Sequence, residues 1–197
     1  MSTRGAIGFR KNNSDKLTYN HYDSYPSGLG EEIVDFIKNT SIEEMNKLFD
    51  ELKLINLDYD MQKGCLKLNQ QEIDILKFFI ADERQIYGLN DCIEEYLYRL
   101  NNNPLFYYKH ESSIKEMVDN NSFIKDSLFC EYGYIINLDT NKLEIWKGFQ
   151  KKPDSNNRYG VENVDGYYPC KMIKEISFSY IKTNRFSLEK SLGKKYS

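Results

Sequence analysis

The densest group of residues that could do chemistry is the segment 19–30, which reads YNHYDSYPSGLG. It combines hydrogen-bonding side chains, aromatic rings and glycines directly before a predicted helix. Backbone N–H groups at the start of a helix favour an anion, and glycines let a ligand approach the backbone. The alternative is that these residues only shape a turn. The candidate ligand-binding residues of this segment are Tyr19, Asn20, His21, Asp23, Ser24, Tyr25, Gly28 and Gly30.

Two further features belong to this candidate site. Arg4 or Arg10, on the strand that precedes the segment, could supply positive charge to a bound anion. His21 stands two residues before Asp23, so a carboxylate could orient it as a general base. The alternative is a structural histidine inside a hairpin. The motif of a phosphate-binding loop is absent, because no Gly-Lys-Ser/Thr sequence follows the glycines.

A second candidate group lies on two predicted strands in the C-terminal third. Strict alternation places Glu131, Trp146 and Gln150 on the strand face opposite the apolar residues. This face could be the floor of a pocket, on which the Trp146 indole stacks against a base or sugar. The alternatives are an ordinary mixed polar face and, for Trp146, a place in the core.

Cysteine and histidine usage predicts neither a metal nor a cofactor. The cysteines Cys65, Cys92, Cys130 and Cys170 form no C-x-x-C pair, and the chain has 2 His. The N-terminus lacks the apolar stretch of a secretory signal, so we expect free thiols and a cytoplasmic location. The apolar runs are too short to cross a membrane. A net charge of −3 predicts no general affinity for duplex nucleic acid.

Hydrophobic periodicity indicates which elements position these residues. Alternation predicts strands, and spacings of three and four residues predict helices. Leu143, Ile145 and Phe149 should share the apolar face of one strand, and Ser41 and Glu44 form a capping box. The predicted strands are 4–10, 16–22, 131–138, 143–149 and 172–181. The predicted helices are 31–38, 41–54, 71–80, 90–100 and 112–118.

This order predicts an α+β fold with a single antiparallel sheet. An isolated hairpin is marginal in water, so the N-terminal and C-terminal hairpins should join the same sheet, which the central helical segment covers. At 197 residues the chain is long enough for one domain, here residues 1–182. Residues 151–168 should form a long loop. Residues 183–197 should form a short, basic and frayed tail.

Several segments together resemble a family of uncharacterised proteins of bacteria and their phages. They include TRGAIGF at 3–9, the segment 19–30 already described, DSLFCEYGY at 126–134 and LEIWKGFQ at 143–150. The resemblance covers both ends of the chain and not the central helices. It implies a shared fold and a shared pocket, and it assigns no reaction and no catalytic residue.

We therefore expect a binding protein rather than an enzyme. Its ligand would be a phosphate-bearing nucleotide or a nucleotide-derived host defence signal, which a phage-encoded protein would sequester in the host cytoplasm. One alternative is a hydrolase of small nucleotides or amides. Such an enzyme would use His21 with Asp23, Glu131, or an N-terminal Ser2 freed by removal of Met1. Another is an inhibitor that binds a protein and no small ligand. A homo-oligomer is possible.

Overall fold

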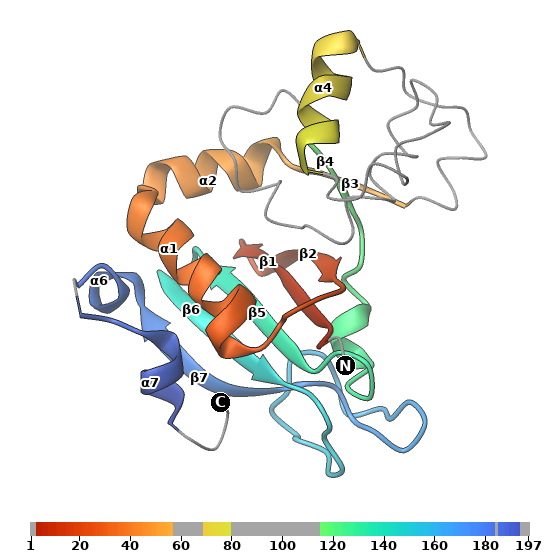
Figure 1. Cartoon of the computed structure of the whole chain (residues 1–197). Coiled ribbons are helices and arrows are strands. Elements are labelled where there is room, and N and C mark those ends of the chain that lie inside the picture. The colour runs from red at the N-terminus through yellow and green to blue at the C-terminus, as the bar shows by residue number, and fades with distance from the viewer. Residues whose placement is uncertain (1–2, 57–68, 80–114, 184, 194–197) are drawn as a thin grey trace.

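The computed structural model describes residues 3–56, 69–79, 115–183 and 185–193. Its centre is a five-stranded sheet with the strand order β2-β1-β5-β6-β7 (Figure 1). The N-terminal and C-terminal hairpins share this sheet, as the alternation predicts. The strands are β1 (Gly5–Lys11), β2 (Ser14–Asn20), β5 (Tyr132–Asn137), β6 (Lys142–Lys147) and β7 (Lys171–Ser177).

The prediction of an antiparallel sheet is wrong at one pair of strands. β1 and β5 run parallel, with Gly5 opposite Tyr132 and Arg10 opposite Asn137. The other three pairs are antiparallel. A tight hairpin forces its two strands to be antiparallel, whereas a long crossover leaves the direction free. More than one hundred residues separate β1 from β5, so the pattern within each strand could not fix their relative direction.

The central strands β1, β5 and β6 are buried on both faces of the sheet. On one face, Tyr134, Ile136, Leu143 and Ile145 pack under α1 (Glu31–Asn39), in agreement with the alternation. The other face carries a smaller core rather than the mixed polar surface that the sequence suggested. The side chains of this smaller core are Ala6, Leu17, Ile124, Cys130, Ile135, Trp146 and Cys170, with Phe123 and Tyr159 packed against them.

The first helices start where the sequence predicts them. α1 covers 31–39, and α2 (Ile42–Glu51) begins with the expected capping box of Ser41 and Glu44. α2 ends before the predicted 54, because the chain continues as β3 (Lys53–Ile55). α4 (Gln70–Phe79) matches the predicted helix 71–80, and the predicted helix 90–100 lies outside the described residues.

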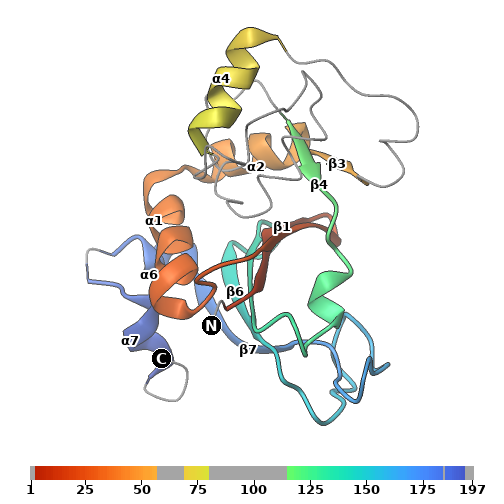
Figure 2. The same cartoon turned by 45° about the vertical axis from the view of Figure 1, so that its right-hand side comes forward.

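The predicted helix 112–118 is wrong where it can be checked. Residues 116–118 form β4 (Glu116–Val118), which pairs in parallel with β3 in a separate small sheet (Figure 2). Met117 and Val118 are buried in the larger core. Their burial and the main-chain pairing with β3, a contact distant in sequence, outweigh the local helical spacing.

The C-terminal segment is packed where we expected fraying. β7 ends at Ser177 rather than at 181, and α6 (Phe178–Ile181) follows it. α7 (Leu188–Leu192) lies beside the start of α1, with Leu188 fully buried. The Glu31 carboxylate accepts hydrogen bonds from Ser187 Oγ at 2.8 Å and from the Glu189 N–H at 3.2 Å. Residues 185–193 are therefore part of the packed structure.

The turns of the two hairpins are tied together by one carboxylate. Asn12 and Asn13 form the tight β1–β2 turn at φ of 53° and 59°. Their N–H groups donate to Asp139, in the β5–β6 turn, at 2.8 and 3.1 Å. These hydrogen bonds stabilise the charged form and lower the pKa of Asp139 below its ordinary value of 3.8.

We predict that Asp139→Asn lowers the free energy of unfolding by about 1 kcal/mol at pH 7. The value is at the low end for a charged acceptor because Asp139 is exposed to water. A lowered pKa contributes stability above the unfolded pKa and loses it as pH falls through the folded pKa. The difference in free energy of unfolding between parent and variant, measured by urea denaturation, should therefore become smaller as the pH falls below 3.8. Glu162→Gln, on the exposed loop after β6, serves as the control, and a difference that stayed constant with pH would contradict this role.

Candidate functional site

Four chain segments distant in sequence meet at one end of the sheet, where β1 and β5 begin and β6 ends. Backbone hydrogen bonds join them: Ser24 N–H to the Thr3 carbonyl at 3.0 Å, and Glu131 N–H to the Arg4 carbonyl at 3.0 Å. Gly148 N–H donates to the Glu131 carbonyl at 2.9 Å, and Phe149 N–H to the Ser127 carbonyl at 2.7 Å. This end therefore brings together the segments that the sequence analysis singled out separately.

The polar side chains of the segment 19–30 hold the segment itself together. Asn20 and Ser24 are buried, and the Asn20 amide donates to the Ser24 hydroxyl at 2.6 Å and to the Tyr22 carbonyl. The Tyr134 hydroxyl reaches across from β5 and donates to the Ser24 carbonyl at 2.9 Å. These contacts favour a structural role for Asn20 and Ser24.

The backbone donors at which we expected an anion are already engaged. The N–H groups of Gly28 and Gly30 donate to the Tyr25 carbonyl, and that of Leu29 donates to the Asp23 carbonyl. Close packing also leaves no room for a side chain at Gly28 and Gly30. A Cβ on Gly28 would lie 2.4 Å from the Asp23 carbonyl oxygen, and one on Gly30 would lie 2.7 Å from a Leu188 methyl group. The helix start is therefore closed by its own chain.

The aromatic side chains of this segment differ in exposure. The Tyr19 hydroxyl lies 2.5 Å from Nδ1 of His21, and burial raises the pKa of Tyr19. The Tyr22 and Tyr25 side chains are exposed. Asp23 is also exposed, at a positive φ of 51°. His21 is thus held by Tyr19 in the hairpin, and the Tyr22 and Tyr25 rings are on the surface.

Aromatic rings and cations are in contact with one another at this end of the sheet. Lys147 Nζ lies 3.6 Å from the centroid of the Tyr132 ring and 5.5 Å from that of Phe149. Phe149 contacts Tyr167 at 6.4 Å between centroids, and Lys151 Nζ lies 3.2 Å from the Tyr167 centroid. The Arg4 guanidinium covers Phe129 at 5.0 Å. We name this group the ring–cation row; its residues are Arg4, Phe129, Tyr132, Lys147, Phe149, Lys151 and Tyr167. Of its rings, Phe129 and Phe149 are exposed, Tyr167 is half-buried and Tyr132 is buried.

Phe149 has the most unusual conformation in the row. Its φ is +59°, in the left-handed region that bulky residues rarely adopt, and its side chain is 46% exposed. The preceding Gly148 lies so close to Cys130 that a Cβ would be 2.0 Å from the Cys130 carbonyl oxygen. Strained residues of this kind cost about 1–3 kcal/mol and concentrate at functional sites. The sequence predicted Phe149 on the buried face, and the turn at Gly148 and Phe149 exposes it instead.

The cations of the row each lie over an aromatic ring. Within the described residues, Arg4, Lys147 and Lys151 form no ion pair with a carboxylate. Lys16, Lys125 and Lys174, which lie outside the row, likewise form no ion pair within the described residues. Arg10, Lys142 and Lys171 are each bound to an acidic side chain. Partial burial lowers the pKa of Lys147, and the charge of nearby Glu131 offsets part of this effect. The row therefore presents positive charge that a ligand phosphate could neutralise.

The remaining candidate residues lie beside or beneath the row. Glu131 directly precedes β5. Gln150 donates its side-chain amide to the Lys147 and Gly148 carbonyls at 3.0 and 2.9 Å. Gln150 thus supports the turn that exposes Phe149. Trp146 is 3% exposed and packs in the smaller core, which favours the core role for this indole. Among the described residues, the buried Oδ1 of Asp126 has no hydrogen-bond partner.

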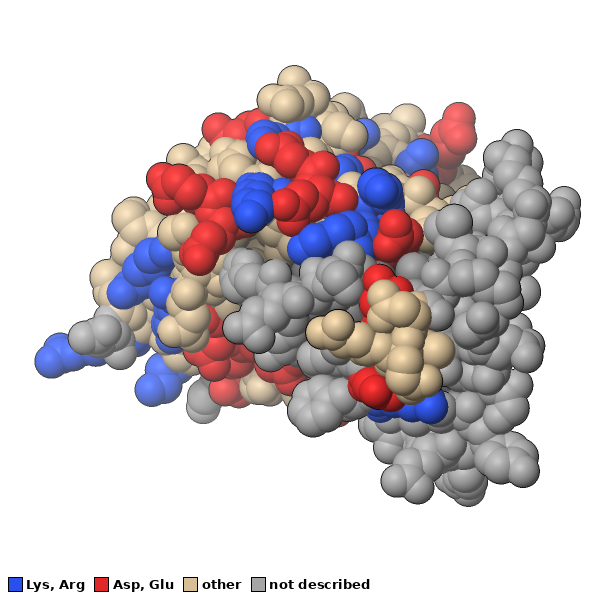
Figure 3. All heavy atoms as spheres, turned by 90° about the horizontal axis from the view of Figure 1, so that it is seen from above, with Lys and Arg blue, Asp and Glu red and all other residues tan. Residues whose placement is uncertain are grey.

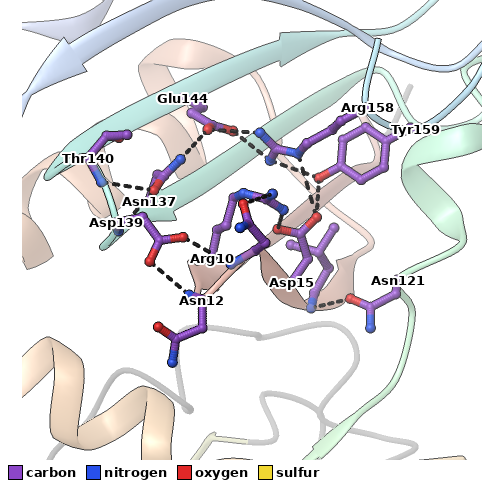
Figure 4. A network of polar contacts seen from close by, with 12 residues as sticks. Arg10, Asn12, Asp15, Asn121, Asn137, Asp139, Thr140, Glu144, Arg158 and Tyr159 are labelled. Carbon is purple, nitrogen blue, oxygen red and sulfur yellow. Dashed lines mark hydrogen bonds and ion pairs between the residues drawn. The ribbon is translucent and has the colours of Figure 1, made fainter.

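A polar network that the sequence did not reveal fastens the long loop after β6 to the sheet (Figure 4). Glu144 is 2% exposed, and its carboxylate receives both terminal nitrogens of Arg158, at 2.8 and 2.6 Å. Asn137 and the Trp146 indole also donate to Glu144, at 2.7 and 3.0 Å. Burial by itself would raise the pKa of Glu144, but these donors more than offset it and the pKa is lowered.

The network continues from the loop to β2. Tyr159 donates to Asp15 at 2.9 Å, and Arg10 binds the other oxygen of Asp15 at 2.9 Å. Burial raises the pKa of Tyr159, and the charge of Asp15 raises it further. The Arg158 guanidinium also covers the Trp146 ring at 4.7 Å. Because Arg158 lies within the loop between Lys151 and Tyr167, the network restrains the segment that carries both of these row residues.

Several further observations bear on chemistry. Within the described residues, no three His, Cys, Asp or Glu side chains cluster as they would to hold a metal ion. Cys130 and Cys170 are free and buried, and burial raises the pKa of Cys130 well above its ordinary value. Cys65, Cys92 and Ser2 lie outside the described residues. In the described part of the chain, no helix is both long and apolar enough to cross a membrane.

Comparison of the chain with protein-family models, with characterised proteins and with solved structures finds no match in any of the three.

We predict that Arg158→Ala lowers the free energy of unfolding by about 3 kcal/mol, because it leaves the buried Glu144 carboxylate without its main partner. The double variant Glu144→Gln/Arg158→Leu removes both charges, so its free energy of unfolding should fall by less than that of Arg158→Ala. Urea denaturation of both measures the difference. A double variant that is less stable than Arg158→Ala would contradict the coupling between the two side chains.

Proposed function

We propose that the protein binds a phosphate-bearing nucleotide at the ring–cation row and releases it unchanged. The observation that carries the proposal is Phe149, an exposed ring held at a positive φ between Lys147 and Lys151. A strained, exposed aromatic residue contributes little to packing, so a ligand that stacks on it would account for its position. Base–aromatic stacking contributes about 1–3 kcal/mol per base.

The unpaired cations support the phosphate part of this ligand. Lys147 and Lys151 lie over rings and form no ion pair within the described residues, so a phosphate would not have to displace one, although the charge of Glu131 acts on Lys147. Arg4 adds a third positive charge over the Phe129 ring. The proposed site thus retains Arg4, Glu131 and Gln150 from the sequence prediction and moves the anion contact from the 28–30 backbone to side chains.

Sequestration of a nucleotide-derived signal is the role that suits such a binding protein. The proposal favours binding over catalysis because the row lacks a paired acid and base placed against its exposed rings. The rival hydrolase would have to use His21, which is hydrogen-bonded to Tyr19, or Glu131. Incubation with ATP followed by denaturation separates the possibilities: ATP recovered intact supports sequestration, and ATP recovered as products supports the hydrolase. Absence of retained ATP favours the inhibitor that binds a protein.

We predict that Phe149→Gly weakens ATP binding about 5- to 150-fold, as expected for the loss of one stacking contact. Its stability should stay within about 1 kcal/mol of the parent, since relief of the strained φ offsets the flexibility of glycine. Calorimetry measures the affinity and urea denaturation the stability. Tyr180→Ala serves as the control, because Tyr180 is an exposed ring away from the row. It lies on α6, whose first residue, Phe178, is hydrogen-bonded to Asn141 in the β5–β6 turn at the other end of the sheet. Unchanged affinity in Phe149→Gly would remove Phe149 from the site.

The lowered pKa of Lys147 predicts a pH dependence. The protonated amine binds phosphate, so affinity for ATP should fall as the pH rises through a pKa that lies below 10.5. Lys147→Arg should abolish this fall, because arginine stays charged. Lys142→Ala, at the other end of β6, should bind as the parent does. If the parent and Lys147→Arg lost affinity in parallel between pH 8 and 10, another group would be responsible.

A further inference from the structure

We infer that the ligand of the ring–cation row contains at least two nucleotide units, as in a short single-stranded oligonucleotide. This inference rests on the proposed function and specifies the ligand of the same site. It follows from how rings and cations are paired within the row, rather than from any one contact.

The two rings at the centre of the row cannot hold the same base. The centroids of Phe149 and Tyr167 are 6.4 Å apart, and their planes are inclined by 65°. A planar base that lies flat on one ring therefore meets the other at a steep angle. Lys151 lies over one face of the half-buried Tyr167 ring, so a base could stack there only on the other face. Stacking on both rings therefore requires two bases.

Each of these rings has a cation nearby, although Lys147 lies closer to the Tyr132 ring, at 3.6 Å, than to Phe149. Lys147 lies 5.5 Å from the Phe149 centroid, and Lys151 lies 3.2 Å from the Tyr167 centroid. The repeated pair of ring and cation on the protein matches the repeated pair of base and phosphate in a strand. Proteins that bind single strands combine such stacking rings with positive charge along the backbone path. Phe129 with Arg4 forms a third pair at the same end of the sheet.

The charge elsewhere on the protein argues against a duplex. On the face seen from above, basic and acidic side chains lie intermixed (Figure 3). Ion pairs such as Lys11 with Asp50 at 2.7 Å and Lys115 with Glu51 at 3.1 Å neutralise cations around α2. A duplex presents its phosphates outward and stacks its bases inside, so its bases could not stack on the exposed Phe129 and Phe149 rings. Single-stranded nucleotides expose both groups at once.

The test compares three ligands on the full-length protein by calorimetry: AMP, the dinucleotide pApA, and a 12-base-pair duplex. We expect pApA to bind about 5- to 150-fold more tightly than AMP, as one further stacked base predicts. Its affinity should also fall more steeply with salt, by about 0.7 in the slope of log K against log salt for each added phosphate contact. The duplex should bind more weakly than pApA.

Two variants locate the second unit. Tyr167→Ala should weaken pApA binding and leave AMP binding nearly unchanged, whereas Phe149→Gly should weaken both. Equal affinity for AMP and pApA would overturn the inference and leave the proposed nucleotide site intact. Tighter binding of the duplex would also overturn it. If neither AMP nor pApA bound while circular dichroism showed a folded protein, the inference and the proposed site would fail together.

Discussion

The parallel pairing of β1 with β5 is the contact on which the rest of the structure depends. It joins two hairpins from opposite ends of the chain into one sheet, with Gly5 opposite Tyr132. Neither hairpin has enough apolar surface to be stable by itself, but the combined sheet supports a core on each face. The same pairing places the starts of β1 and β5 side by side. Every residue of the ring–cation row is positioned, directly or through a neighbouring loop, by that arrangement.

Burial of both sheet faces explains why a charged network lies beneath an irregular loop. The smaller core around Trp146 needs a cover, and the segment after β6 provides it without regular secondary structure. Arg158 fixes this cover by neutralising Glu144, a carboxylate that would otherwise be costly to bury. Long loops of this kind are uncommon in compact domains and often serve binding. Here the cover also carries Lys151 and Tyr167, which links the stability of the fold to the geometry of the proposed site.

The candidate site lies near the predicted one but consists mainly of different residues. The segment 19–30 supplies a closed turn in which Asn20 and Ser24 bond to each other. The groups proposed to bind a ligand are instead Phe149 and the cations of the row. The signal for them was present in the order Lys147, Phe149, Lys151, a cation, ring, cation pattern. Strand alternation assigned Phe149 to the buried face, because a single residue at positive φ breaks the period of two and cannot be predicted from that period.

Local chemistry allowed the sequence by itself to determine much of the secondary structure. Ser41 and Glu44 mark the start of α2, and alternation marks β5 and β6 and their apolar face. The α+β class and the sharing of one sheet also follow from these patterns. Tertiary structure decided the parallel direction of β5, the strand at 116–118, the packing of Leu188, and the ion pair of Glu144 with Arg158. These features depend on contacts between residues far apart in the chain, and periodicity reports only which face a side chain takes, never which distant partner meets it.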